Sequence, residues 1–353
     1  MANAMMPDPT RLVTGGIDTH KEAHVAAVVD DVGAEIATNA FPATAAGYHQ
    51  LAQWLSSHGQ LGRVGIEGCG SWGAGIARHL TETGLDVVEI NRPNRQQRRS
   101  QGKSDPLDAL SAARSALAGI DAGTPKTGTG PVESIRMLRF TRRSAIKART
   151  QTINQIRAVL DTAPHQIRDQ HRTLTPIRLI KTITKSRPNP GDVNKPAVAA
   201  TITLNLLGRR WQFLTDQINT IDDLLENLVA QTAPGLIAMR CIGTHSAAAL
   251  LIAAGDNPHR LATEGSFAAL CGTNPLPASS GKTVRHRLNR SGDRDANNAL
   301  WRIVMSRMAH DQRTRDYVER RTTEGLSKRE IIRCLKRYVA REIYPTLIND
   351  LTT

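Results

Sequence analysis

Residues 13–41 decide the fold class, and they read VTGGIDTHKEAHVAAVVDDVGAEIATNAF. Three short runs of apolar and β-branched residues occupy 13–18, 24–30 and 34–41. Such runs are typical of strands, and residues 31–33 supply turn chemistry between the second and the third. This stretch therefore predicts a three-stranded β-meander.

The following residues extend the meander into a mixed α/β domain. We expect a helix at 48–55, a strand at 62–67, a helix after Gly73, a strand at 86–90 and a helix after Asp105. The order β-β-β-α-β-α-β-α is that of a ribonuclease H-like fold, in which a mixed sheet carries helices on its faces. We assign residues 1–130 to this α/β domain.

Two long helical patterns follow, at 135–160 and 204–228, and a basic, proline-rich stretch separates them. In the second pattern, apolar residues alternate three and four apart, as in a heptad seam. The seam consists of Leu204, Leu207, Trp211, Leu214, Ile218, Ile221, Leu225 and Leu228. We predict an antiparallel coiled-coil hairpin over 131–232, and a homo-oligomer, dimer or tetramer, in which the seam takes part. Two helices packed on a globular domain without oligomerisation is the alternative.

Residues 233–353 predict a small, mainly α-helical C-terminal domain. Glycines and prolines break the pattern between 255 and 281, and residues 327–351 have the spacing of a basic amphipathic helix. The chain is thus expected to contain an α/β domain, a helical hairpin and a helical C-terminal domain.

The charge balance points to a polyanionic partner, because the 353 residues carry a net charge of +14. No apolar run approaches the roughly 20 residues that span a bilayer, and the N-terminus lacks the hydrophobic centre of a signal peptide. We therefore expect a cytoplasmic, nucleoid-associated protein without a membrane partner. Aromatic residues make up only 3% of the chain, which favours contacts to phosphates over base stacking.

Four carboxylates are positioned to meet at one edge of the predicted sheet. Asp18 ends one strand and Glu67 ends another, and adjacent central strands would bring them together. Asp105 and Asp108 lie three apart at the start of a helix whose first turn contains Pro106. Taken singly, each is more often a helix cap or a solvated residue.

Grouped carboxylates repel one another unless cations neutralise them, and hard oxygen ligands select Mg²⁺ or Mn²⁺. Two ions about 4 Å apart would activate an attacking oxygen and stabilise the leaving oxygen of a phosphodiester. In a basic chain with this strand order, the four carboxylates predict a nuclease centre. His20 and His24 do not form a helical HExxH zinc site, because a strand and a turn are expected there.

Basic residues flank these carboxylates and recur at helical spacing further along the chain, as expected of contacts to phosphates. The residues expected to bind nucleic acid are Lys21, Arg95, Arg98, Arg99, Lys103, Arg136, Arg139, Arg143, Lys147, Lys282, Arg285, Arg287 and Arg290. A single run of this kind is more often a solvated helix face.

A serine loop near the C-terminus is a second candidate for chemistry. Ser279, Ser280 and Gly281 lie among the basic residues of the segment 282–290. Serine is a weak nucleophile, and guanidinium groups and metal ions that hold a phosphate would favour its attack. Without such neighbours, Ser-Ser-Gly would be an ordinary turn.

Five motifs in order resemble the insertion-sequence one-ten family of transposases: GIDTHK, EGCGSW, KSDPLDA, GTNPLPASSG and SGDRDANNALW. The resemblance implies a RuvC-like DEDD domain followed by a serine-bearing transposase domain. It implies that Asp18, Glu67, Asp105 and Asp108 bind the metal ions and that Ser280 is the nucleophile. It also implies donor and target DNA, and a noncoding bridge RNA encoded by the element, as partners.

The motifs depart from the family pattern at two places. The usual P-G-I-G hairpin reads Arg240-Cys241-Ile242-Gly243, and the Leu-Pro pair at 276–277 leaves Ser279 as a second candidate nucleophile.

Three other functions compete with an RNA-guided transposase. A Holliday-junction resolvase would use the four carboxylates alone and form no covalent intermediate. A tyrosine recombinase, with Tyr338 or Tyr344, would need an ordered Arg-His-Arg-Tyr set that the sequence does not show. A non-catalytic nucleic-acid-binding protein would not need the four carboxylates.

Overall fold

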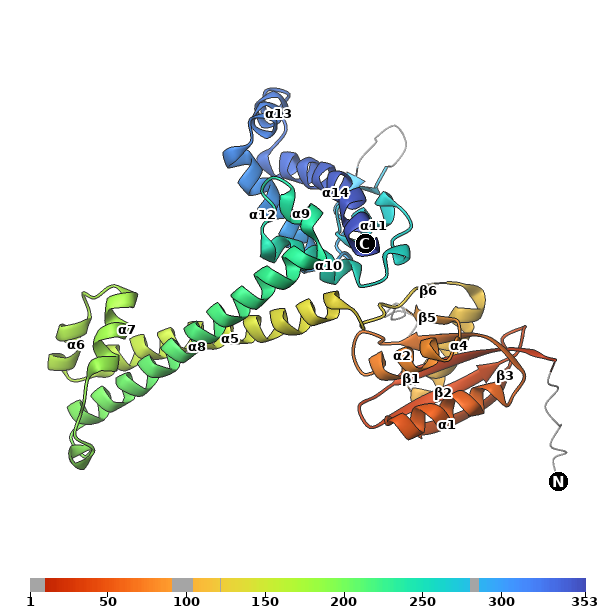
Figure 1. The fold of residues 1–353 in the computed structure, drawn as a ribbon, viewed down its shortest axis with the longest axis horizontal. Helices are drawn as coiled ribbons and strands as arrows, with labels where there is room; N and C mark the ends of the chain where they lie inside the picture. The colour runs from red at the N-terminus through yellow and green to blue at the C-terminus, as the bar shows by residue number, and fades with distance from the viewer. Residues whose placement is uncertain (1–9, 91–103, 121, 280–285) are drawn as a thin grey trace. The chain divides into compact units, whose positions relative to one another are not determined.

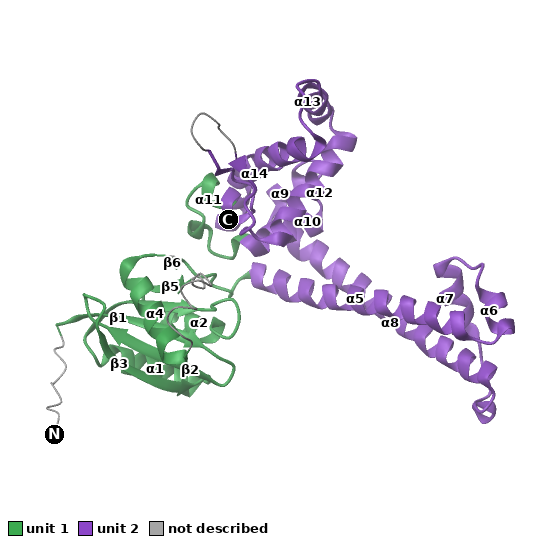
Figure 2. Cartoon of the chain, turned by 180° about the vertical axis from the view of Figure 1, so that it is seen from behind, with its two compact units in different colours: residues 1–130, 254–267 green, residues 131–253, 268–353 purple. Residues whose placement is uncertain are grey.

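The computed structural model describes residues 10–90, 104–120, 122–279 and 286–353. The chain forms two compact units, which Figure 2 shows in separate colours. Unit 1 comprises residues 1–130 and 254–267, and unit 2 comprises residues 131–253 and 268–353. Our division into three domains stays a prediction from the sequence.

Unit 1 is built on a six-stranded mixed sheet with the order β3-β2-β1-β4-β5-β6. β1, β2 and β3 are antiparallel, β1, β4 and β5 are parallel, and β6 is antiparallel to β5. The strands are β1 (Leu12–Thr19), β2 (Ala23–Val29), β3 (Glu35–Pro42), β4 (Gln60–Glu67), β5 (Val87–Ile90) and β6 (Ala122–Gly123). The predicted meander and mixed α/β sheet are confirmed, whereas β6 was not predicted.

Helices cover both faces of this sheet (Figure 1). On one face, α1 (Ala45–Ser56) and α2 (Ala74–Glu82) contribute large apolar side chains such as Leu51 and Leu80. On the other face, α4 (Asp105–Ala118) contributes mainly alanines, which pack on alternate residues of β2 and β5. The two faces therefore differ in how closely a helix approaches the sheet.

Two glycines let the backbone of α4 lie directly on the sheet. A Cβ on Gly16 would come within 2.1 Å of the Ala113 nitrogen and 2.2 Å of the Ala109 carbonyl oxygen. A Cβ on Gly65 would come within 2.6 Å of the Ala112 carbonyl oxygen. Since real Cβ atoms do not approach backbone this closely, both positions require glycine for this packing.

Residues 254–267 belong to unit 1 although they are distant in sequence. Buried Asn257 donates a hydrogen bond to the Pro125 carbonyl at 2.9 Å, and Arg260 donates to the Thr124 carbonyl at 2.9 Å. The short 3-10 helix η2 (Pro258–Arg260) and the start of α11 (Glu264–Leu270) lie in this segment.

Unit 2 contains an antiparallel pair of long helices, α5 (Pro131–Thr162) and α8 (Pro196–Thr232), as predicted. Between them lie α6 (His165–His171), α7 (Pro176–Lys185) and the 3-10 helix η1 (Pro190–Asp192). Pro176 and Pro196 occupy first turns, where a missing backbone N–H costs nothing. The prolines of this stretch therefore start helices as well as interrupting them.

The heptad seam of α8 packs inside the chain. Leu214 and Ile218 bury themselves against Ala145 of α5, and Leu204 packs with Ile183 of α7. Packing within one chain thus accounts for the regular spacing of the seam. Self-association stays a prediction.

The rest of unit 2 is helical, apart from a two-stranded ribbon. Its elements are α9 (Pro234–Ala238), α10 (Thr244–Ala254), β7 (Leu276–Pro277), β8 (His286–Arg287), α12 (Arg294–His310), α13 (Gln312–Thr323) and α14 (Lys328–Thr352). Arg307 of α12 forms a two-pronged ion pair with Glu342 of α14, at 2.7 and 2.9 Å. The mixed sheet domain followed by a helical C-terminal region is confirmed.

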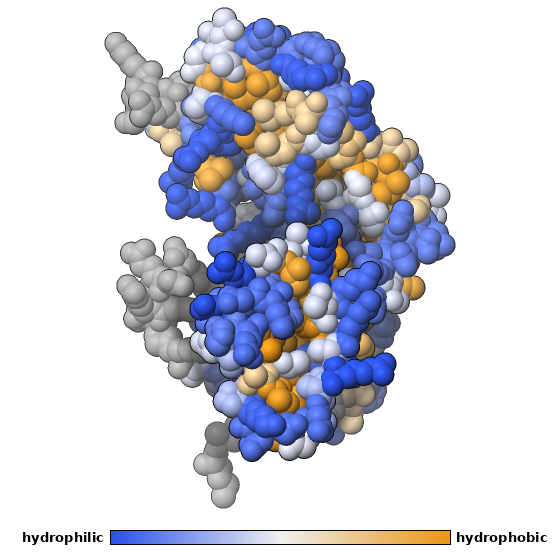
Figure 3. Space-filling view, turned by 90° about the vertical axis from the view of Figure 1, so that its left-hand side faces the viewer, coloured by the Kyte–Doolittle hydropathy of each residue, from blue (hydrophilic) through white to orange (hydrophobic). Residues whose placement is uncertain are grey.

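Hydrophilic residues cover most of the face shown in Figure 3, with separate hydrophobic patches between them. Among the described residues, no helix has the length and apolar character needed to cross a membrane.

The turn between α9 and α10 generates a stability prediction. Cys241 has a φ of 65°, and it is the one non-glycine residue with positive φ in the described part of the chain. A side chain in this conformation costs about 1–2 kcal/mol, whereas glycine loses about 0.5–1 kcal/mol in chain entropy. Cys241→Gly should therefore raise the free energy of unfolding by about 0.5–1 kcal/mol in urea titrations. Cys241→Ala keeps the Cβ and should not raise the free energy of unfolding. A Cys241→Gly variant with a lower free energy of unfolding than the wild type would contradict this account.

Candidate metal-dependent active site

Asp18 and Glu67 lie side by side at the carboxyl ends of two parallel strands. The residues before them, Ile17 of β1 and Ile66 of β4, are paired in register. Thr19 joins the two strand ends, because its hydroxyl donates a 2.8 Å hydrogen bond to the Glu67 carbonyl. Asp18 and Glu67 are each only 8% exposed.

The N-terminus of α4 brings two more carboxylates to this edge. Asp105 and Asp108 are in its first turn, where the positive end of the helix dipole favours acidic groups. Gly16 and Gly65 precede Asp18 and Glu67 by two residues, so they lie on the same face of the sheet and under α4. The contact that seats α4 on the sheet therefore also positions the carboxylates.

His20 connects Asp18 to Asp105. Its Nε2 atom lies 3.0 Å from Oδ2 of Asp18 and 3.3 Å from Oδ1 of Asp105. Ligand atoms of these three residues all lie within 4.8 Å of one another. Glu67 and Asp108 are close enough to act on Asp18 through their charges.

The pKa of Asp18 lies above its ordinary range. Burial is the largest cause, because it penalises the charged form, and the charges of Asp108 and Glu67 act in the same direction. His20 opposes them through its charge and its hydrogen bond. Burial, more than repulsion between the carboxylates, therefore makes the charged form of Asp18 unfavourable.

A divalent cation fits this set of side chains. Carboxylate oxygens are the ligands that Mg²⁺ and Mn²⁺ prefer, and a bound cation would favour the charged form of Asp18, which burial and, to a smaller extent, the neighbouring carboxylates disfavour. Asp18, Asp105 and His20 offer ligand atoms directly, and Glu67 and Asp108 lie nearby.

Sequence reasoning missed His20 as part of this site. It considered His20 only together with His24, whose ring is fully buried and stacks on Tyr48 at 5.5 Å. Burial lowers the pKa of His24. The signal for His20 was its position two residues after Asp18, just beyond the end of the strand.

The basic residues predicted to bind nucleic acid have different environments. Arg136 pairs with Glu133, Arg143 pairs with Asp295, and Arg139 is half-buried. Lys21, Lys147, Arg287 and Arg290 are exposed, as are Arg136 and Arg143. Those outside the described residues are Arg95, Arg98, Arg99, Lys103, Lys282 and Arg285.

The serine loop is described only at its two ends. Ser280, the candidate nucleophile, lies outside the described residues, and Ser279 is exposed. The flanking strands β7 and β8 pair with each other, and Leu276 is opposite Arg287.

Two family models match the chain. A transposase model of the DEDD type in the IS110 family matches residues 15–164. A model of the IS116/IS110/IS902 family of transposases matches residues 234–319. The chain belongs to the IS110 family of transposases.

The chain is also similar to a Streptomyces coelicolor protein named as a transposase for the IS117 mini-circle. The two are 29% identical over 202 residues, which cover 54% of this chain and 47% of the relative. The matched region thus spans about half the length of that relative.

The burial of the Asp18 carboxylate beside other carboxylates leads to a prediction about stability. Because folding raises the pKa of Asp18, the folded protein binds the proton of the Asp18 carboxyl more tightly than the unfolded protein does. The free energy of unfolding therefore falls as the pH rises from the pKa of Asp18 in the unfolded chain to its pKa in the folded chain. At neutral pH without metal, Asp18→Asn should therefore raise the melting temperature by a few degrees. Mg²⁺ should stabilise the wild type and not the variant, because the variant has lost a ligand.

Calorimetry in EDTA and in Mg²⁺ measures both effects. Asp31→Asn, which removes an exposed carboxylate elsewhere in unit 1, is the control and should behave as the wild type. A melting temperature of Asp18→Asn below that of the wild type in EDTA would contradict this account. A rise in the melting temperature of the variant with Mg²⁺ as large as that of the wild type would also contradict it.

Proposed function

We propose that this chain is a DNA transposase that cleaves and rejoins strands with two Mg²⁺ or Mn²⁺ ions and a serine nucleophile. Asp18, Glu67, Asp105 and Asp108 hold the ions, and Ser280 attacks the DNA. The observation that carries the proposal is the convergence of the carboxylates at the ends of β1 and β4 and the start of α4. Membership of the IS110 family supports DNA as the substrate.

We assign unit 1 to the RuvC-like, ribonuclease H-like folds. Its antiparallel meander, followed by parallel strands with helices on both faces, supports this assignment. A family model of the DEDD type matches the same region.

The proposed reaction exchanges one phosphodiester for another. The Ser280 hydroxyl loses its proton and its oxygen bonds to the scissile phosphorus, while the bond from phosphorus to one sugar oxygen breaks. The released sugar hydroxyl receives a proton. In rejoining, a sugar hydroxyl of another strand end attacks the phosphoserine and frees Ser280. Ions held by Asp18, Glu67, Asp105 and Asp108 would supply Lewis-acid stabilisation of the phosphate oxygens.

The partners in this proposal are donor and target DNA, an element-encoded guide RNA and further copies of the chain. The net charge of +14 supports binding to nucleic acid in general. The guide RNA rests on the family resemblance, and self-association stays a prediction from the heptad pattern of the sequence.

A hydrolytic resolvase is the second candidate, because the described site contains the carboxylates and its chemistry needs no serine. In that reaction water takes the place of Ser280, and no protein-linked strand forms. The two candidates therefore differ in one observable species.

A denaturing gel with labelled DNA and Mg²⁺ distinguishes them. Wild type and Ser279→Ala should both give a slow-migrating protein–DNA adduct, whereas Ser280→Ala should lose it, because only Ser280 bonds to phosphorus. Strand exchange by Ser280→Ala should fall at least a thousandfold, while its DNA affinity changes little.

Two outcomes would change the assignment. Loss of the adduct only in Ser279→Ala would move the nucleophile by one residue. Efficient cleavage by wild type without any adduct would favour the resolvase.

A further inference from the structure

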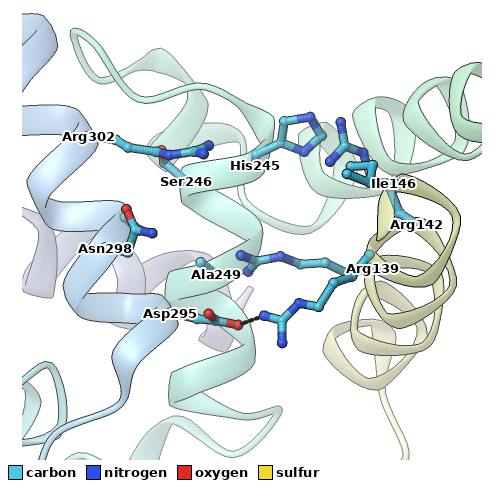
Figure 4. A pocket seen from close by; sticks show the side chains of 11 residues that line it. Arg139, Arg142, Ile146, His245, Ser246, Ala249, Asp295, Asn298 and Arg302 are labelled. Carbon is cyan, nitrogen blue, oxygen red and sulfur yellow. Dashed lines mark hydrogen bonds and ion pairs between the residues drawn. The ribbon is translucent and has the colours of Figure 1, made fainter. Parts of the chain in front are cut away.

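Unit 2 contains an arginine-rich pocket whose lining includes none of the four carboxylates proposed to bind metal. α5, α10 and α12 line it, and its volume is about 210 Å³. Figure 4 shows Arg139 and Arg142 on α5, His245 on α10 and Arg302 on α12 extending into it. Four arginines and one histidine thus line a small hollow.

Acidic groups neutralise only part of this charge. Arg143 pairs with Asp295, and Arg142 pairs with Asp222 of α8. Neither Arg139 nor Arg302 has an ion pair within the described residues. Two guanidinium groups are therefore left to face the pocket.

Arg139 is in an unfavourable place for a cation. Its pKa is lowered, chiefly by burial and also by the positive charges of Arg143 and Arg302. Asp295 and Asp293 oppose this shift without removing it. An arginine that is partly desolvated beside other arginines gains most from an anion that bonds to it.

His245 adds a group that senses charge in the same pocket. Burial lowers its pKa first, and then the positive charges of Arg142, Arg139 and Arg302 lower it further. Asp222 raises it, and its carboxylate lies 3.6 Å from Nε2 of His245. An anion in the pocket would favour the protonated ring.

We propose that this pocket binds one backbone phosphate of the DNA strand on which the transposase acts, with Arg139 and Arg302 as its main ligands. Arginine recognises phosphate oxygens through paired N–H donors. The volume is below the roughly 300 Å³ at which pockets begin to hold whole drug-sized ligands, so it suits a phosphate and not a nucleoside.

The choice of DNA rests on the proposed function. α12, which contributes Arg302, begins a few residues after the loop that carries Ser280. Asp293, the N-cap of α12, is tied to the preceding helix by a hydrogen bond from its nitrogen to the Leu270 carbonyl at 2.7 Å. The pocket and the proposed nucleophile therefore belong to neighbouring segments of the same unit.

The first arm of the test uses inorganic phosphate and NMR of the histidine ring signals of the full chain, with His245 assigned from a His245→Gln spectrum. Phosphate should raise the pKa of His245 in the wild type. The double variant Arg139→Gln, Arg302→Gln should lose this response. The control Arg209→Gln, an exposed arginine on α8, should keep it.

The second arm measures duplex DNA binding over a range of salt concentrations. The double variant should bind roughly tenfold more weakly, and its log–log salt slope should be smaller by about 0.9, the value for one phosphate contact. Weaker binding to single-stranded RNA with unchanged DNA binding would overturn the assignment to DNA.

An unchanged His245 titration in phosphate, measured on the folded wild type, would overturn the site itself. A phosphate response with no change in DNA affinity or slope would overturn the strand contact. None of these readouts depends on cleavage, so a failure here is distinct from loss of the Ser280 adduct, which tests the proposed function.

Discussion

The close approach of α4 to the sheet is the contact on which the site depends. Gly16 and Gly65 let the helix backbone touch β1 and β4, and alanines along α4 keep that distance short. The first turn of α4 then meets the ends of both strands, where Asp18 and Glu67 lie. A larger residue at either glycine would move the helix, and Asp105 with it. The close packing of α4 on the sheet and the position of the carboxylates thus both depend on Gly16 and Gly65.

The carboxylate cluster of unit 1 and the arginine pocket of unit 2 carry opposite charge. Burial makes the charge of Asp18 unfavourable, and neighbouring carboxylates add to the effect, so a bound cation would stabilise this arrangement. Unit 2 has the opposite imbalance, since its arginine pocket contains more positive charge than nearby acids neutralise. We propose metal ions for the first site and a phosphate for the second, which are the two charged components of phosphodiester chemistry.

Local patterns predicted most of unit 1. Strand alternation and turn residues led to the sheet, and the GGID, VGIE and KSDPLDA segments led to the proposed set of four carboxylates, because each signal lies within a few residues. Contacts between distant segments were missed. The contact of His20 with Asp105 could be recognised only once the position of α4 was known. The arginine pocket could be recognised only once α5 was placed beside α10 and α12. β6 gives little sequence signal because it is only two residues long. The sequence shows the regular apolar spacing of the heptad seam, but only the structure shows that α5 and α7 pack against it.

The central claim is that these carboxylates hold a pair of divalent ions. Anomalous diffraction from crystals of the full chain soaked in Mn²⁺ tests it most directly, because manganese can be located by its own scattering. We predict two peaks about 4 Å apart among Asp18, Glu67, Asp105 and Asp108, and neither peak in Asp18→Asn crystals. Manganese bound only elsewhere, or wild-type carboxylates without a peak under saturating Mn²⁺, would contradict the account.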